Sequence, residues 1–158
     1  MMCIERQYKA YEKLAQGKDW DRSEEYRQLL DECWRISLDE KGADESIWNM
    51  HEAIKPEYLN KSIDANTLEW CYANIFAGNV EEVLVNLLDE NGYEETFRLL
   101  NLDYIVTFLN EDAPINDPKD NELIIREKIR QEQDEKDMDI ICCFNDAQKW
   151  YSQCESLI

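Results

Sequence analysis

The chain has 158 residues, 44% of them hydrophobic and 11% aromatic, and its 36 acidic and 17 basic side chains give a net charge of −19. This length and aromatic content suit one domain with its own core and exclude a disordered acidic chain, which buries too little surface to offset its ordering entropy. The negative charge argues against binding to nucleic acid or to an anionic membrane surface, since both would repel it.

The N-terminal residues 1–7 carry charges and no apolar run of signal-peptide length, and no later segment approaches the ~18 apolar residues of a membrane span. The six cysteines contain no Cys-x-x-Cys pair, and the adjacent Cys142 and Cys143 do not fit a disulfide framework. We therefore expect free thiols and a reducing, cytoplasmic location.

Two helices separated by Gly17 are predicted at the start of the chain. The first has its apolar residues on one face, and Gly17 follows it where a left-handed cap is favoured. Asp21 and Glu24 resemble a capping arrangement for the second helix, whose apolar stripe runs from Tyr26 to Leu38. The pair is expected to form a helical hairpin.

A third helix is predicted over residues 44–54, and further helices follow. Gly78 and Asn79 are expected to end a fourth helix and to cap a fifth. The stretch 66–92 resembles a single ankyrin-type repeat, but the chain has no second copy of it and lacks the usual proline of that pattern. An ordinary antiparallel helix pair is therefore expected instead.

The segment 93–109 should form one bent helix or two short ones, although residues 104–108 have the composition of a strand. The apolar spacing is helical almost everywhere else. The predicted fold is therefore all-α, a compact bundle of about seven or eight helices with, at most, one small β element.

One loop divides this predicted single domain. Residues 111–121 contain Pro114 and Pro118 among polar side chains and should connect a main helical body, 1–110, to a C-terminal helical hairpin, 122–158, that packs on the body.

The hairpin comprises two predicted helices. The first, over about 119–136, is polar all round in its second half, which should be exposed or covered by a partner. The second has coiled-coil-like spacings of four and three, through Ile140, Phe144, Ala147, Tyr151, Cys154 and Ile158. Because this seam is less than three heptads long, we expect it to pack on the chain's own body rather than to drive self-association.

The sequence offers no recognisable catalytic, metal or cofactor motif. His51 is the only histidine, and its position suggests a packed or surface role. Cys142, Cys143 and Cys154 are poor joint ligands, because adjacent helical residues point about 100° apart. With four glycines and no Gly-rich loop, a phosphate-binding turn is not expected. We therefore predict no catalytic residues, no metal ligands and no cofactor.

The acidic side chains are unevenly distributed. Residues 62–118 hold twelve acids and a single base, Arg98, and so carry more than half of the charge excess. Such a row of negative charges complements Lys and Arg side chains that normally hold phosphates. The predicted partner-binding residues are Glu81, Glu82, Asp89, Glu90, Glu94, Glu95, Asp103, Glu111 and Asp112. Acids of the C-terminal hairpin, Glu127, Glu132 and Glu135, are expected to matter less.

These features favour a protein-binding role over catalysis. The leading hypothesis is an acidic inhibitor, monomeric or weakly dimeric, that blocks a basic nucleic-acid-handling enzyme without itself binding nucleic acid or membrane. An immunity protein for a bacterial nuclease toxin and a phage anti-defence or anti-CRISPR nucleic-acid mimic share this general character. The alternatives are a helical adaptor or oligomeric structural protein, whose charge only maintains solubility, and an enzyme whose site has no linear motif.

Overall fold

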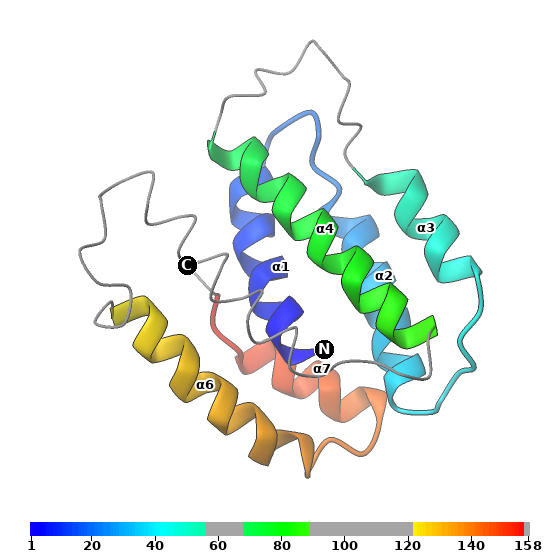
Figure 1. Cartoon of the computed structure of the whole chain (residues 1–158), viewed down its shortest axis with the longest axis vertical. Coiled ribbons are helices and arrows are strands. Elements are labelled where there is room, and N and C mark those ends of the chain that lie inside the picture. Colours follow the sequence, from blue (N-terminus) through cyan, green and yellow to red (C-terminus); the bar gives the residue numbers. More distant parts are fainter. Residues whose placement is uncertain (56–67, 89–121, 157–158) are drawn as a thin grey trace.

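The computed structural model describes residues 1–55, 68–88 and 122–156 of the chain (Figure 1). Within these ranges the chain forms six α-helices and no strand. They are α1 (Met2–Ala15), α2 (Ser23–Ser37), α3 (Ser46–Ile54), α4 (Leu68–Leu88), α6 (Glu122–Met138) and α7 (Phe144–Gln153). The all-α class is thus confirmed for the described part, with six helices there rather than seven or eight. Residues 104–108, which have the composition of a strand, and the predicted loop 111–121 both lie outside the described residues.

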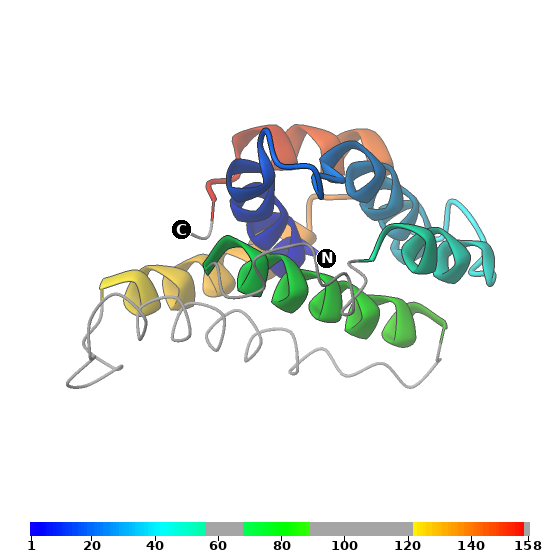
Figure 2. The same cartoon turned by 90° about the horizontal axis from the view of Figure 1, so that it is seen from above.

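Helix α1 is central to the bundle. It packs against α2 and α4, while α3 contacts both α2 and α4, and α7 contacts α2. Figure 2 shows that α4 lies on one side of α1 and α7 on the other. A helix with neighbours on several sides has little surface left for solvent, which explains why almost all of its first ten residues are buried.

An aromatic cluster joins three of the helices. Tyr11 of α1 stacks on Phe76 of α4 with ring centroids 4.8 Å apart, and Tyr26 of α2 meets the two rings edge-on at 5.2 and 4.9 Å. All three side chains are buried. Such aromatic pairs contribute about 0.5–1.5 kcal/mol each beyond the burial of their surface, so this cluster fixes the angle between the helices as well as stabilising them.

The turn between α1 and α2 follows the sequence closely. Gly17 adopts a φ of 76°, the left-handed conformation that ends a helix and that glycine tolerates without strain. The Asp21 carboxylate accepts hydrogen bonds from the backbone N–H and the hydroxyl of Ser23, at 2.9 and 2.6 Å, where α2 begins. The predicted hairpin start is therefore confirmed, with Asp21 just before the helix rather than at its cap.

The expected break at Gly78 and Asn79 does not form, because α4 continues through both residues. The prediction of separate fourth and fifth helices is wrong, and so is a helix pair centred on this point. Asn79 does not cap a helix; instead its buried side-chain amide donates to the Gln7 Oε1 atom of α1 at 2.7 Å. A glycine inside a helix costs only about 1 kcal/mol relative to alanine, which the packing of α4 on α1 readily exceeds.

Three consecutive polar residues of α1 are buried, and each pairs with a different helix. Glu5 accepts hydrogen bonds from Arg27 of α2, Arg6 donates to Glu127 of α6, and Gln7 accepts from Asn79 of α4. Successive residues of a helix point about 100° apart, so the three side chains reach three surroundings. Because buried polar groups are costly without partners, these pairs specify which helix lies where around α1.

Helix α7 begins later than its apolar spacing predicts. Ile140, the predicted first seam residue, lies outside the helix and is 70% exposed, whereas Ile141 is buried. The backbone N–H of Phe144 donates to the Glu40 carboxylate at 2.7 Å, so a side chain from the turn after α2 satisfies the first N–H of α7. Phe144 and Ala147 then pack against Met2 and Trp34 in a second, smaller core.

No described helix is both long and apolar enough to cross a membrane.

Candidate functional site

Only two of the predicted partner-binding residues lie in the described part of the chain. Glu81 and Glu82 are neighbours on α4, and Glu82 is exposed. Glu81 points toward α3, where it approaches His51 and Lys55. The other members of the set lie outside the described residues: Asp89, Glu90, Glu94, Glu95, Asp103, Glu111 and Asp112.

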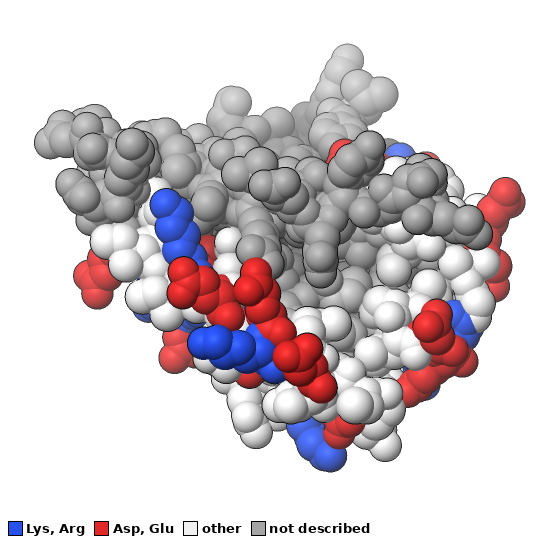
Figure 3. All heavy atoms as spheres, turned by 60° about the horizontal axis from the view of Figure 1, so that its bottom comes forward, with Lys and Arg blue, Asp and Glu red and all other residues white. Residues whose placement is uncertain are grey.

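Many basic side chains of the bundle are held by its own acids. The described Lys and Arg residues in ion pairs are Arg6, Lys18, Arg27, Arg35, Lys41, Lys55, Arg130 and Lys149. On the face shown in Figure 3, acidic side chains gather in separate groups, several of them beside a basic one. Each of these pairs combines one acid with one base, so pairing leaves the acid excess of the chain unchanged.

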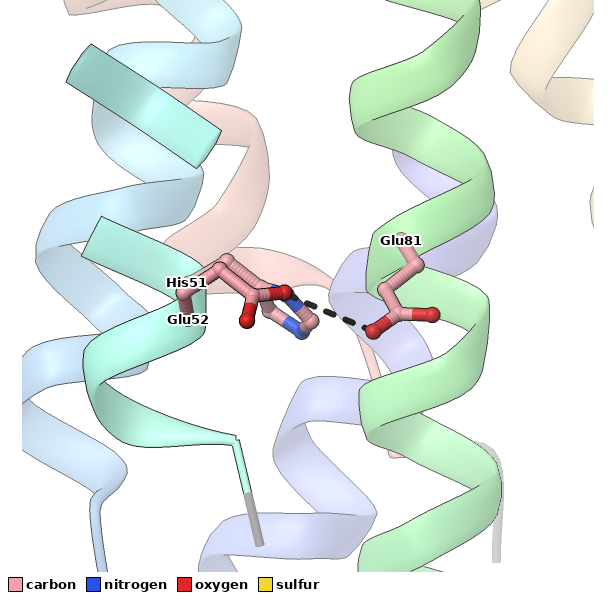
Figure 4. Close-up of side chains that lie close together, drawn as sticks. All are labelled: His51, Glu52 and Glu81. Atoms are coloured by element: carbon pink, nitrogen blue, oxygen red, sulfur yellow. Dashed lines mark ion pairs between the residues drawn. The ribbon is translucent and has the colours of Figure 1, made fainter. Parts of the chain in front are cut away.

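A histidine and two carboxylates converge where α3 meets α4 (Figure 4). His51 and Glu52 lie on α3 and Glu81 lies on α4. The potential ligand atoms of the three side chains all fall within 4.8 Å of one another. The imidazole is fully buried, whereas the Glu52 and Glu81 side chains are 40% and 36% exposed. The cluster therefore has a buried imidazole behind two carboxylates that solvent can reach.

The hydrogen bonding of His51 fixes its tautomer. Its Nε2 atom lies 3.2 Å from the Ala77 carbonyl oxygen, which can only accept, so Nε2 carries the proton. In the neutral ring Nδ1 then has a free lone pair, and this buried atom has no hydrogen-bond partner among the described residues. Burial lowers the pKa of His51 below its usual value of 6.5, against the opposing influence of Glu81, so the neutral form prevails at neutral pH.

Lys55 places a positive charge beside this cluster. Its ammonium group donates to Glu52 and lies 3.5 Å from the Glu81 carboxylate. The hydrogen bond to Glu52 raises the pKa of Lys55 above its usual value. Two carboxylates thus share one ammonium ion at the open side of the imidazole, an arrangement that shows the position suits a cation.

A second group of charges lines a pocket between α6 and α7. Arg6, Arg130, Asp134 and Trp150 contribute to its walls. Arg6 is paired with Asp134, and Arg130 with Glu155. Because these arginines already have carboxylate partners, we assign them to holding α6 against α1 and the end of α7.

The sequence did not point to the cluster of His51, Glu52 and Glu81. Its members come from two helices, and the intervening residues 56–67 give no spacing rule that relates the helices to each other. The adjacent pair His51 and Glu52 was the only local signal, and it is not specific. The sequence marks Glu81 only by its negative charge.

Comparison of the chain with protein-family models, with curated proteins and with solved structures finds no match.

Proposed function

We propose that this chain is an acidic inhibitor that binds and blocks a basic, nucleic-acid-handling enzyme, as an immunity protein or an anti-CRISPR nucleic-acid mimic would. The observation that carries the proposal is the excess of twelve acids over one base in residues 62–118. Negative charge at that density attracts the Lys and Arg side chains with which such an enzyme holds phosphates.

The described part of this segment supports the proposal through α4. Its buried residues, including Tyr72, Phe76, Val80 and Leu84, anchor one face of the helix in the core. Glu82 is exposed on a helix that is held in place. Charges on a rigid element lose little conformational entropy when a partner binds, so they serve recognition better than charges on a mobile chain.

The test compares two triple charge reversals with equal change in net charge. The first replaces Glu82, Glu94 and Glu95 with Lys, and the second replaces the exposed acids Glu122, Glu132 and Glu135 of α6. Glu81 and Glu127 are left unchanged, because Glu81 contacts His51 and Lys55, and Glu127 is a buried partner of Arg6. Wild type and both variants are immobilised at low salt, exposed to bacterial lysate, and the retained proteins are identified by mass spectrometry.

We expect wild type and the α6 triple variant to retain a nuclease or another nucleic-acid-binding enzyme. The triple variant at Glu82, Glu94 and Glu95 should not retain it. The purified enzyme should be inhibited by wild type, with an association rate that falls as salt increases. Equal retention by both variants, or retention of an enzyme that stays fully active when bound, would refute the proposed role of residues 62–118.

A second candidate is a helical adaptor or oligomer, and one observation favours it. Ile125 and Ile129 lie one turn apart on α6 and are 45% and 62% exposed. The predicted heptad seam does not supply this interface, since Phe144 and Ala147 are buried against the body of the same chain. A dimer that resists salt in light scattering and dissociates in the Ile129→Glu variant would favour this candidate.

A further inference from the structure

We propose that His51, Glu52 and Glu81 form a binding site for a divalent transition-metal cation between α3 and α4. The site is independent of the proposed partner, although Glu81 also belongs to the acidic segment. The three side chains offer one nitrogen and two carboxylate ligands whose atoms lie within 4.8 Å of one another. Small rotations of the exposed carboxylates would place all three ligand atoms ~2.0–2.2 Å from a shared metal ion, the length that metal–ligand bonds require.

The buried imidazole is the observation that distinguishes this cluster from an ordinary group of surface acids. The Nδ1 atom of His51 is fully buried, has no hydrogen-bond partner in the described part of the chain, and faces Glu81 at 3.8 Å (Figure 4). Its other nitrogen donates to the Ala77 carbonyl oxygen. Metal-bound histidines characteristically donate the second ring N–H to a carbonyl or carboxylate, which orients the ring and fixes the tautomer.

The ligand set indicates which cations fit. One imidazole with two carboxylates suits Mn²⁺, Fe²⁺ or Zn²⁺, whereas Mg²⁺ and Ca²⁺ prefer oxygen ligands alone. Three protein ligands leave coordination positions for water, and the exposed sides of Glu52 and Glu81 give a path from solvent. The metal would link α3 directly to α4.

Lys55 competes with the metal for the same carboxylates. Its ammonium group is hydrogen-bonded to Glu52 and 3.5 Å from Glu81, so metal binding must displace it. This competition makes a distinctive prediction: removal of the Lys55 charge should strengthen metal binding, whereas a residue needed only for folding would not have that effect.

The test uses Mn²⁺, which thiolates bind poorly, so the six cysteines do not confuse the result. Because His51 is the only histidine, the imidazole C–H signals in the proton NMR spectrum report on this site alone. Protein freed of metal with a chelator is titrated with Mn²⁺ at neutral pH. We expect the His51 signals to broaden from the first additions of Mn²⁺ and the effect to level off once the site is filled, since the paramagnetic ion would bind directly to the ring.

Two glutamates on the same helix provide the matched comparison. In Glu81→Gln a ligand is lost, and the affinity should fall at least about tenfold, as it does even when an outer-shell partner of a metal is removed. Glu82→Gln removes the same charge from the neighbouring position and should leave the affinity within about twofold of wild type. Lys55→Gln should bind more tightly than wild type.

Each other outcome counts against the site. Equal weakening in the two glutamine variants would show that Mn²⁺ only follows the net negative charge. Unbroadened His51 signals in both wild type and Lys55→Gln, with Mn²⁺ in excess, would show that Lys55 is simply the ion-pair partner of two carboxylates. Circular dichroism of every variant confirms that the fold is retained before the affinities are compared.

Discussion

Arg6 of α1 and Glu127 of α6 form a bidentate ion pair, with Nε and Nη2 of the arginine 3.0 and 2.9 Å from the two carboxylate oxygens. The side chains are 2% and 1% exposed. Arg6 also donates two hydrogen bonds to Asp134, at 3.0 and 2.8 Å. Although burial alone would lower it, these carboxylates raise the pKa of Arg6 above its usual value, so the charged arginine holds α6 against α1.

Replacement of Arg6 with Met should therefore destabilise the fold severely. The substitution leaves Glu127 buried without its cation, and removing one partner of a buried ion pair costs about 3–5 kcal/mol. Urea unfolding measures the loss, and the additional Glu127→Leu substitution should recover much of it. The exposed Arg126 of α6 is the control, since its replacement with Met should change stability by no more than about 0.5 kcal/mol. Equal losses in the two single variants would contradict the pairing.

The NMR signals of His51 provide a pH test of how Glu81 and Lys55 are placed around its ring. Burial lowers the pKa of His51 below 6.5, Glu81 raises it and Lys55 lowers it. In metal-free protein, NMR titration should give a pKa below 6.5 that falls further in Glu81→Gln and rises in Lys55→Gln. Since the unfolded chain takes up the proton first as pH falls, the contribution of His51 to stability should decline below pH 6.5. Shifts of the opposite sign would contradict the placement of these groups.

Two glycines should respond to alanine in opposite directions. Gly78 lies inside α4, and an added Cβ would meet nothing within 4 Å. Gly78→Ala should thus stabilise the protein by about 0.5–1 kcal/mol. Gly17 has equal space but a φ of 76°, so Gly17→Ala should cost about 1–2 kcal/mol. Thermal unfolding compares the two, and a destabilising Gly78→Ala would indicate that the chain turns there after all.

The thiols should differ in reactivity according to burial. Burial raises the pKa of Cys33 to about 12 and that of Cys3 to about 11, whereas Cys142 is exposed. A thiol reagent at pH 8 should therefore modify Cys142 rapidly in the native protein and Cys33 only after unfolding. All six cysteines should titrate as free thiols in denaturant. Mass spectrometry of partly labelled protein identifies the order, and early labelling of Cys33 would contradict its burial.

Sequence periodicity predicted the fold where local signals and packing agree. Gly17 ends α1, and the apolar stripe of α2 from Tyr26 to Trp34 is buried. Prediction from periodicity failed where tertiary contacts override a local preference. Gly78 remains inside α4 because packing exceeds the cost of a helical glycine, and α7 starts at Phe144 because Glu40 satisfies its first N–H there.

The candidate site was less predictable, because its geometry depends on partners that are distant in sequence. Periodicity treats Glu5, Arg6 and Glu127 as surface charges, and only their mutual arrangement makes burial favourable. Likewise, no spacing rule brings His51 to Glu81. The acid excess over residues 62–118 was visible from composition, but its geometry beyond Leu88 lies outside the described residues. The partner-binding role remains a prediction.

The pairing of α1 with α6 also sets an order of events during synthesis. Arg6 leaves the ribosome long before Glu127, which follows it by 121 positions. Until then Arg6 has no Glu127 to neutralise it, so burying its charge would be unfavourable. The side of α1 that faces α6 should therefore stay hydrated while α2 and then α4 assemble around the other sides of α1. The bundle should therefore close from its N-terminal helices, with α6 docking as one of the last steps, and a chain truncated before α6 should remain loosely packed.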